Sequence, residues 1–359
     1  MAIAHGYAAH SHDTPLVPYS FERRALRDDD VQIEILYSGV CHSDMHTVHN
    51  EWDGSVYSDG TLYPSVPGHE IVGRVTALGP SATRFKVGDV VGVGTMVDSC
   101  GACEPCKEGM EPYCEKYATW TYNSPDRVTG ENTKGGYSDL IVVREAFVLS
   151  IGHKPELVPA TAPLLCAGIT MWSPLTHWQV GPGKKVGIVG IGGLGHMGLK
   201  LAHALGAKVV AFTTSPSKVE DARALGADEV VISRNPEEMA AQANSFDLII
   251  DTIAVPHSLD PYLALLKRHG TLTLVGIPAE PHPSPSVVNL IAGRRNLSGS
   301  LVGGIRETQA MLDFCAAHDL VPDIETIAMR DIDTAFTRMA KNDVKYRFVI
   351  DMATMDKAA

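Results

Sequence analysis

Residues 1–150 show the short alternations of apolar and polar side chains that are typical of β-strands. Residues 31–37 alternate between the two kinds, which is the period of a half-buried strand. Residues 70–79 and 88–94 are short apolar runs interrupted by glycine, and they also predict strands. Short strands at this spacing indicate a small barrel or sandwich.

The pattern changes after residue 157. Residues 158–178 are mostly helical in character, and buried-strand runs then alternate with amphipathic segments. Strands that alternate with helices predict a parallel sheet covered on both faces. The predicted strands lie at 185–190, 208–213, 229–232, 247–250 and 271–275, and the predicted helices at 194–205, 216–225, 236–243 and 259–267.

The alternation ends after Leu301, and an amphipathic helix at about 307–317 begins a C-terminal tail. The length of 359 residues favours two domains rather than one. Apolar residues make up 45% of the chain and charged residues 20%, which supports sizeable cores and argues against disorder. The predicted class is therefore α/β, with a β-rich domain and a doubly wound parallel-sheet domain.

The net charge of −12 makes nucleic acid and anionic membranes unexpected partners, because no basic block is present. No run of about 18 apolar residues occurs, so no membrane span is expected. The N-terminus lacks the pattern of a signal peptide. Seven clustered cysteines without an export signal favour metal binding in a reducing cytoplasm over a disulfide framework.

Residues 190–195 read Gly-Ile-Gly-Gly-Leu-Gly, follow a predicted strand and open a predicted helix. In this context the motif predicts a dinucleotide site. Gly190 permits the tight turn, Gly192 lets the backbone approach a pyrophosphate, and Gly195 lets the helix pack on the strand. Backbone N–H groups at the helix start would bind the phosphate oxygens. The alternative is a glycine-rich turn without a ligand.

The acidic residue that usually holds the ribose 2′-hydroxyl of NAD is missing at the end of the second predicted strand. Thr214, Ser215 and Lys218 stand there instead. Two hydroxyls and an ammonium suit the additional 2′-phosphate of NADP(H). Ser215 before Pro216 is also a plausible helix cap, and both interpretations can hold together.

Four cysteines at positions 100, 103, 106 and 114 lie within a short segment. Four thiolates form a closed tetrahedral zinc site, which is structural rather than catalytic. An iron–sulfur cluster is the alternative, because a ferredoxin run begins with the same spacing. Seven residues rather than three separate Cys106 from Cys114, and Pro112 precedes the last cysteine, so zinc is preferred.

A second group of ligand types is scattered along the chain. Cys41 follows a predicted strand, His69 and Glu70 begin another, and Cys166 lies in a helical segment. Singly, such a histidine is more often a surface or core residue, and such a cysteine a buried apolar one. Together they offer two cysteines and a histidine, the composition of a catalytic zinc with an open position, and Glu70 could supply a fourth ligand.

These motifs together resemble the zinc-dependent medium-chain alcohol dehydrogenases. The resemblance is to the cinnamyl-alcohol-dehydrogenase-like branch, which includes bacterial NADP-dependent aldehyde reductases. The matching segments span nearly the whole chain in the order of the family. They lie at 39–44, 67–70, 100–114, 165–170, 190–195 and 344–350.

The resemblance implies a GroES-like catalytic domain, a Rossmann domain inserted into it, and two zinc ions per chain. The catalytic domain would comprise residues 1–157 and 303–359, with a structural-zinc lobe at about 95–116, and the NADP-binding domain residues 158–302. The implied catalytic-zinc residues are Cys41, His69 and Cys166, with Glu70 as an exchangeable ligand. The implied structural-zinc residues are Cys100, Cys103, Cys106 and Cys114.

The resemblance also implies contacts with the cofactor and the substrate. Trp52 and Trp120 fall near the substrate pocket of the family, and Ser43 and His46 on its proton path. The alternative for the last two is that Ser43 caps a helix near Asp44 and His46 lies on its exposed face. The implied cofactor-binding residues are His42, Thr170, Gly190, Gly192, Gly193, Leu194, Gly195, Thr214, Ser215, Lys218, Val275, Gly276, Ser300 and Leu301.

We therefore expect an NADP-dependent zinc alcohol dehydrogenase that works mainly as an aldehyde reductase on small aldehydes and alcohols. Several pocket positions of the lignin-pathway enzymes are not recognisable, so a cinnamyl substrate is not implied. The family also suggests a homodimer joined near residues 297–302. The alternatives are a non-catalytic NADPH-binding protein on the same fold, an iron–sulfur electron carrier, and a quinone reductase, which would lack the scattered zinc ligands.

Overall fold

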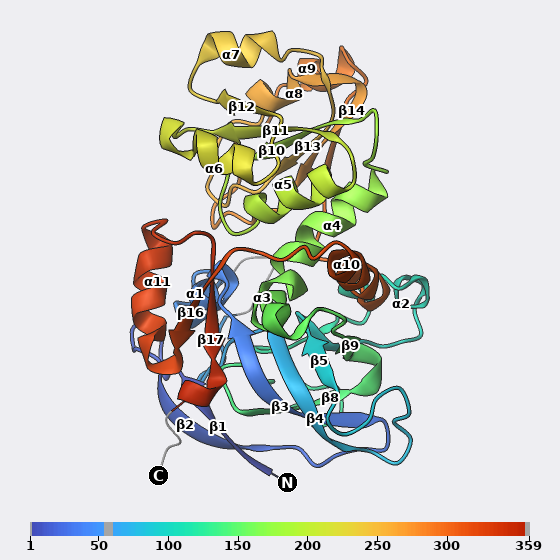
Figure 1. Ribbon diagram of the computed structural model, residues 1–359, viewed down its shortest axis with the longest axis vertical. Helices are drawn as coiled ribbons and strands as arrows, with labels where there is room; N and C mark the ends of the chain where they lie inside the picture. Colours follow the sequence, from blue (N-terminus) through green and yellow to red (C-terminus); the bar gives the residue numbers. More distant parts are fainter. Residues whose placement is uncertain (1, 54–59, 356–359) are drawn as a thin grey trace. The chain divides into compact units, whose positions relative to one another are not determined.

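A computed structural model describes residues 2–53 and 60–355 of the chain. The chain forms two compact units, Met1–Cys166 with Gly303–Ala359 (unit 1) and Ala167–Val302 (unit 2), which Figure 1 colours along the sequence. The first boundary follows Cys166, whereas the sequence pattern places it after residue 157. The difference arises because the helical turns at 158–165 pack against strands of unit 1, where Leu164 and Leu165 are buried.

Unit 1 is built on a mixed sheet. Within the described residues its strand order is β16-β17-β3-β4-β5-β9, and β8 pairs with β3. Strand β17 lies antiparallel to β3, with Val349 opposite Gly39, so the C-terminal tail completes the sheet of the N-terminal part (Figure 1). The strands are β3 (Asp30–Gly39), β4 (Ile71–Leu78), β5 (Val90–Val93), β8 (Leu140–Arg144), β9 (Leu149–Ser150), β16 (Ile324–Ala328) and β17 (Arg347–Asp351).

The alternation in the sequence explains how these elements pack. In β3, Ile33 and Ile35 are buried while Glu34 is exposed, as the strand period requires. In α11 (Ile332–Ala340) the buried residues recur at helical spacing. The other elements of unit 1 are β1 (Ala2–Ala8), β2 (Val17–Arg23), β6 (Met96–Asp98), β7 (Thr119–Trp120), α1 (His42–Val48), α2 (Glu104–Glu108), α3 (Val158–Thr161) and α10 (Ile305–Ala317).

Unit 2 is built on a parallel sheet of order β12-β11-β10-β13-β14-β15 in the described residues. Figure 1 shows helices on both sides of it. This strand order is that of a Rossmann fold, so the predicted α/β class is confirmed. The strands are β10 (Lys185–Val189), β11 (Lys208–Thr213), β12 (Glu229–Ile232), β13 (Phe246–Asp251), β14 (Leu266–Leu274) and β15 (Asn296–Gly299). The helices are α4 (Ala167–His177), α5 (Gly195–Ala204), α6 (Val219–Ala224), α7 (Pro236–Ala241), α8 (Asp260–Leu263) and α9 (Val287–Ile291).

Two predicted helices differ from the structure. The helix expected at 259–267 ends at Leu263, because Leu266 is fully buried and pairs with Phe246 as the first residue of β14. The continuous helix expected at 158–178 is interrupted at Cys166, whose φ of −128° and ψ of −67° are not helical. The interruption separates the turns of unit 1 from α4, and it lies at a candidate metal ligand.

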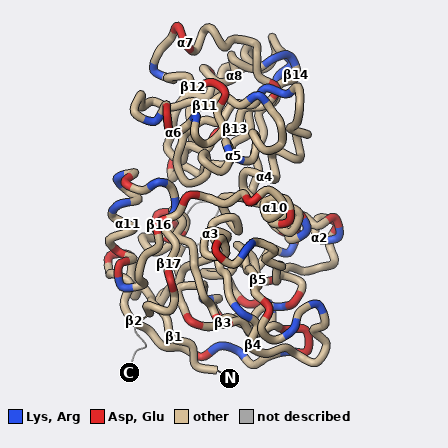
Figure 2. The backbone as a smooth tube through the Cα atoms, viewed as in Figure 1, with Lys and Arg blue, Asp and Glu red and all other residues tan. Residues whose placement is uncertain are grey.

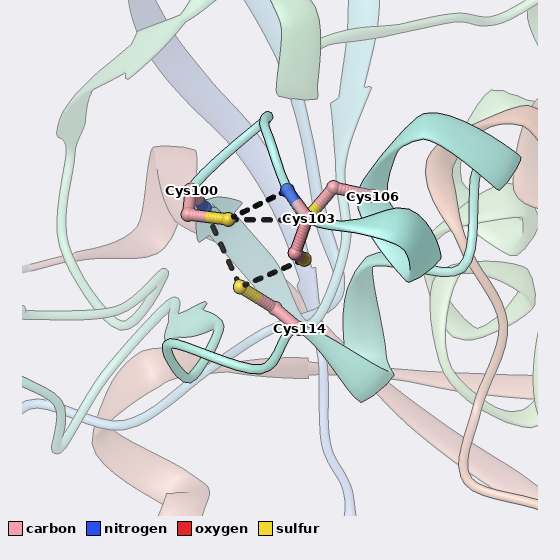
Figure 3. Close-up of side chains that lie close together, drawn as sticks. All are labelled: Cys100, Cys103, Cys106 and Cys114. Atoms are coloured by element: carbon pink, nitrogen blue, oxygen red, sulfur yellow. Dashed lines mark hydrogen bonds between the residues drawn. The ribbon is translucent and has the colours of Figure 1, made fainter.

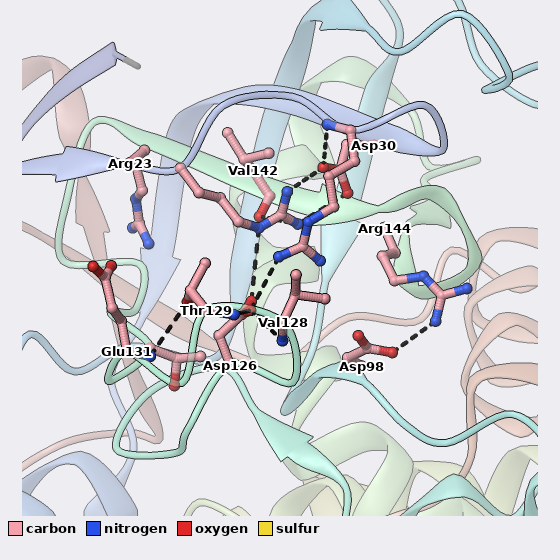
Figure 4. Close-up of polar contacts among 12 residues, drawn as sticks. Arg23, Asp30, Asp98, Asp126, Val128, Thr129, Glu131, Val142 and Arg144 are labelled. Carbon is pink, nitrogen blue, oxygen red and sulfur yellow. Dashed lines mark hydrogen bonds and ion pairs between the residues drawn. The ribbon is translucent and has the colours of Figure 1, made fainter.

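Ion pairs anchor the four-cysteine segment to the sheet of unit 1 (Figure 4). Arg144 in β8 donates to Asp98 over 2.7 Å and to Asp29 over 3.0 Å. Asp98 is the last residue of β6, which precedes the four-cysteine segment, and β6 pairs with β7, which follows it, so the two ends of the segment are held together.

A second polar group lies around Asp126, whose carboxylate accepts hydrogen bonds from Arg27 and from the backbone N–H groups of Val128 and Thr129.

Figure 2 shows that Lys and Arg positions are interspersed with Asp and Glu positions along the backbone. Among the described residues no single helix has the length and apolarity needed to cross a membrane, although the bent pair Pro155–Leu165 and Ala167–His177 passes that test when taken together.

Candidate active site

The scattered ligand types converge in unit 1. Cys41 precedes α1, His69 and Glu70 precede β4, and Cys166 lies at the interruption before α4. All four side chains are buried, and their ligand atoms lie within 4.8 Å of one another. The Cys41 and Cys166 sulfurs are 3.9 Å apart. The structure thus brings together residues that are up to 125 positions apart in the chain.

The buried carboxylate of Asp44 fixes two of these ligands. Its Oδ2 accepts bonds from the Cys41 backbone (2.9 Å) and the Tyr137 hydroxyl (3.0 Å). Its Oδ1 accepts from the Gly68 backbone (3.1 Å) and lies 3.3 Å from Nδ1 of His69. A carboxylate behind a histidine sets the tautomer and turns the other ring nitrogen toward the metal.

The Glu70 carboxylate forms an ion pair with an arginine of the C-terminal tail. Its Oε1 pairs with Arg347 of β17, and Arg347 also donates to the Val40 carbonyl over 3.0 Å. Burial raises the pKa of Glu70 to about 7, and Arg347 opposes that shift. A side chain at Gly39 would overlap the Glu70 carboxylate, so this glycine is required for the space that Glu70 occupies.

The polar atoms in this group fit a zinc ion. His69 Nε2 and Glu70 Oε2 are buried and have no hydrogen-bond partner among the described residues. Such orphaned atoms are costly unless a ligand satisfies them. Zinc–sulfur bonds of about 2.3 Å in a tetrahedron separate two sulfurs by about 3.8 Å, close to the spacing of Cys41 and Cys166. The arrangement offers two sulfurs and a nitrogen, with Glu70 as a possible fourth ligand.

The four-cysteine segment forms a second, separate group (Figure 3). The sulfurs of Cys100 and Cys106 are 3.8 Å apart, and those of Cys103 and Cys114 are 4.0 Å apart. Backbone N–H groups of Ala102 and Cys103 point at the Cys100 sulfur and lower its pKa to about 6. A closed set of four sulfurs at tetrahedral spacing fits structural zinc.

Ser43 and His46 lie on α1 beside the first group. The Ser43 hydroxyl is 3.6 Å from the Cys41 sulfur, and Ser43 does not cap the helix, because the N-cap residue is Cys41. His46 Nδ1 contacts Glu51, and its ring lies 5.1 Å from that of Trp52. No hydrogen bond joins Ser43 to His46 in the described part of the chain. Sequence reasoning missed Glu51, because only the fold shows that its carboxylate contacts the His46 ring.

The glycine turn in unit 2 has the features expected of a phosphate cradle. Gly190 has a φ of +89°, which disfavours any other residue. A side chain at Gly195 would overlap the Gly190 carbonyl, whereas a Cβ at Gly192 would meet open space. Gly193 and Leu194 complete the turn before α5. Gly190 and Gly195 thus have the conformation and close packing that the motif requires, and pyrophosphate binding at Gly192 stays a prediction.

The residues after β11 lie beside this turn. The Lys218 ammonium donates to the Ile191 carbonyl over 2.9 Å. Ser215 occupies an N-cap position, but its hydroxyl makes no capping bond and Thr214 is exposed. Arg234, which sequence reasoning missed, follows β12, where Ser233 donates to the Thr213 carbonyl over 2.9 Å. Among the described residues the Arg234 guanidinium has no ion-pair partner, and its side chain is exposed.

The other predicted cofactor residues of unit 2 gather at the carboxyl ends of its strands. Val275 and Gly276 follow β14, and both donate their N–H groups to the Asp251 carbonyl. Ser300 and Leu301 follow β15, where Ser300 donates to the Leu274 carbonyl over 3.1 Å. Thr170 is buried in α4. In unit 1, His42 is exposed on α1 and Trp120 is partly buried in β7.

Comparisons with known proteins agree with this division. The family model of the alcohol dehydrogenase GroES-like domain matches residues 27–153, and that of the zinc-binding dehydrogenases matches residues 193–317. Aldehyde reductase YahK of Escherichia coli is 60% identical over 97% of both chains. The chain belongs to the zinc-binding alcohol dehydrogenase family, and it is therefore an oxidoreductase of the alcohol and aldehyde class.

Solved structures show the same fold over the whole chain. A cinnamyl alcohol dehydrogenase of Sorghum bicolor is 43% identical with a TM-score of 0.93, and each chain is covered completely. A cinnamyl alcohol dehydrogenase of Helicobacter pylori, complexed with NADP(H), is 42% identical with a TM-score of 0.90 over 99% of both chains. The expected family and fold are confirmed, and the family favours zinc over iron–sulfur chemistry.

We predict about two zinc ions per chain and negligible iron by elemental analysis. Cys103→Ser should chiefly lower folding yield and melting temperature, because structural zinc contributes folding energy. Cys166→Ser should chiefly abolish turnover while the other zinc stays bound. If both variants lose the same zinc fraction and the same stability, the division into a structural and a catalytic site is wrong.

Proposed function

We propose that the protein is a zinc-dependent aldehyde reductase that oxidises NADPH, with unit 1 as the catalytic domain and unit 2 as the cofactor domain. The observation that carries this proposal is the buried group of Cys41, His69 and Cys166. Its histidine Nε2 has no hydrogen-bond partner among the described residues, and the Ser43 hydroxyl lies 3.6 Å from the Cys41 sulfur. The name of the E. coli relative, an aldehyde reductase, supports the direction of the reaction.

Bound at these residues, zinc would polarise a substrate carbonyl as a Lewis acid, and NADPH would supply the hydride to its carbon. The chain's own residues prepare the site for this chemistry. Asp44 orients His69, and Arg347 holds Glu70 at the edge of the ligand group. We place Trp52 and Trp120 along the substrate pocket, where apolar rings would favour small uncharged aldehydes.

Aldehyde reduction also needs a proton at the substrate oxygen. The Ser43 hydroxyl, 3.6 Å from the Cys41 sulfur, is placed to donate it. A serine hydroxyl is a poor acid, so it requires a chain to solvent. A histidine ring can accept a proton at one nitrogen and give one up at the other, and the contact of His46 with the half-exposed Glu51 carboxylate extends the chain to the surface.

We predict that Ser43→Ala lowers kcat by about 10²-fold or more, with zinc content and NADPH affinity retained. His46→Ala and Glu51→Gln should lower kcat less and flatten its pH profile, and small imidazole buffers should partly rescue His46→Ala. Ser20→Ala is a matched control on an exposed strand of the same unit. Full turnover by Ser43→Ala would remove Ser43 from the proton path.

NADPH is the preferred cofactor in this proposal. Thr214 and Ser215 follow β11 and carry hydroxyls at the position where the acid of an NAD-binding domain would repel a 2′-phosphate. In the proposed site, Lys218 and Arg234 supply positive charge to the 2′-phosphate. Arg234 follows a strand that runs about 4.8 Å from β11, so its long side chain can reach the same phosphate. The NADP(H) complex of the H. pylori relative supports this choice.

We predict that kcat/KM is higher with NADPH than with NADH, and that Ser215→Asp reverses or cancels this preference. A carboxylate against the 2′-phosphate costs a few kcal/mol when partly desolvated, enough for a shift of roughly two decades. Ser217→Asp, at an exposed position nearby, should change the ratio far less. Equal kcat/KM for the two cofactors in the parent protein would contradict the proposal.

We further propose that the protein is a cytoplasmic homodimer. The seven described cysteines are free, and six form the two ligand groups, which suits a reducing compartment. Strand β15 ends the sheet of unit 2 and leaves one edge open. Val287, Val288 and Ile291 on nearby α9 are 62%, 69% and 74% exposed. A second copy that pairs with this edge across a two-fold axis would cover the apolar side chains.

We predict that sedimentation of the parent protein gives a dimer and that Val288→Glu with Ile291→Glu shifts it toward the monomer. Two buried carboxylates without partners would be strongly unfavourable at the interface. Val87→Glu is the control, because Val87 is similarly exposed in unit 1. A parent protein that sediments as a monomer at micromolar concentration would contradict the dimer.

A further inference from the structure

A buried carboxylate stands at the centre of the nucleotide-binding edge of unit 2. Asp251 is the last residue of β13 and is 1% exposed. It lies beside Val189, the residue before the glycine turn, because β13 pairs with β10. The strand order reverses between these two strands, and in open α/β sheets ligands bind at that reversal, outside the carboxyl ends of the strands.

Asp251 organises the backbone on both sides of this point. Its carbonyl accepts the N–H groups of Val275 (3.0 Å) and Gly276 (3.3 Å). Its Oδ1 accepts the N–H group of Ile253 over 3.0 Å, and its Oδ2 lies 2.8 Å from Nε2 of His257. The side chain of Asp251 therefore fastens both the beginning and the end of the loop at 252–257.

This loop touches two segments of the proposed cofactor site. The Thr252 hydroxyl donates to the Val189 carbonyl over 2.7 Å, and a Cβ at Gly190 would lie 2.8 Å from that hydroxyl. On the other side, a Cβ at Gly276 would press against the Ile253 carbonyl. The loop is thus packed between the glycine turn and the segment after β14, and a shift of the loop would displace both.

The His257 ring has an acceptor at each nitrogen. Nδ1 lies 2.9 Å from the Val255 carbonyl, and Nε2 faces the Asp251 carboxylate. A neutral imidazole with its proton on Nε2 donates to the Asp251 carboxylate, so the bond that closes the loop needs no added proton. Burial raises the pKa of Asp251, and the contact with His257 opposes that shift.

The other groups that face the pair come from two further elements. His282 in the loop at 277–286 accepts the His257 N–H group over 3.3 Å, and its ring lies 4.8 Å from the His257 ring. Tyr262 in α8 lies 6.1 Å away, and burial raises its pKa to about 12, so it stays neutral. His282 Nδ1 therefore acts as an acceptor toward the His257 backbone, and Tyr262 adds no charge beside the pair.

We propose that Asp251 and His257 are a positioning pair that holds the loop at 252–257 in the conformation that binds the cofactor. The inference rests on the proposed binding of NADPH to unit 2. Because the loop packs against two segments of the cofactor site, loss of the hydrogen bond between His257 and Asp251 should weaken cofactor binding.

The test is the dissociation constant of NADPH, measured by its fluorescence on the zinc-loaded protein. His257→Ala should raise Kd about tenfold, since a hydrogen bond to a carboxylate is lost. Turnover at saturating NADPH should stay within about twofold of the parent. His257→Gln can donate an amide N–H to Asp251, so its Kd should lie nearer the parent than that of His257→Ala.

His203→Ala removes an exposed histidine at the opposite end of the sheet, and its Kd should match the parent. Melting temperatures identify any variant that loses the fold, and His257→Gln is the variant least expected to do so. If the parent binds NADPH but His257→Ala binds it with the same Kd, the positioning pair is wrong. If the parent binds no NADPH, the proposed function fails instead.

Discussion

The carboxylate of Asp44 accepts hydrogen bonds from two backbone segments and a tyrosine, and it stands behind the ring of His69. These bonds join the start of α1 to the segment before β4, which carry Cys41 and His69 respectively. An ionised carboxylate without such donors would be too costly to bury. The geometry of the candidate catalytic site therefore depends on Asp44, although Asp44 itself is not a ligand.

Unit 2 also contains a buried carboxylate that faces a histidine, but this pair has a different role. Asp251 is also buried, accepts from a backbone N–H group and faces a histidine. In unit 1 the far nitrogen of the histidine lies in the candidate zinc group, whereas in unit 2 both nitrogens of the histidine face acceptors in or beside one loop. Each unit thus uses one buried acid to hold a connection in place beside a proposed binding site.

The sequence allowed the local parts of the sites to be predicted. The glycine turn and the four-cysteine segment lie in short stretches whose spacing reflects their chemistry directly. The pairing of Glu70 with Arg347 joins positions 277 residues apart, and no local pattern could indicate it. The roles of Asp44 and Glu51 also needed the fold. The early start of β14 followed from the pairing of Leu266 with Phe246, a tertiary contact that overrides the helical pattern.

The most direct test of this account is the zinc affinity of Asp44→Asn, measured by competition with a chelator. The amide keeps the size of the side chain but removes the charge behind His69. Loss of such an outer partner weakens metal binding by about 10–100-fold. We expect the variant to release one zinc at that lower affinity, while the zinc of the four-cysteine group stays bound. Unchanged affinity for both zinc ions would contradict the central role of Asp44.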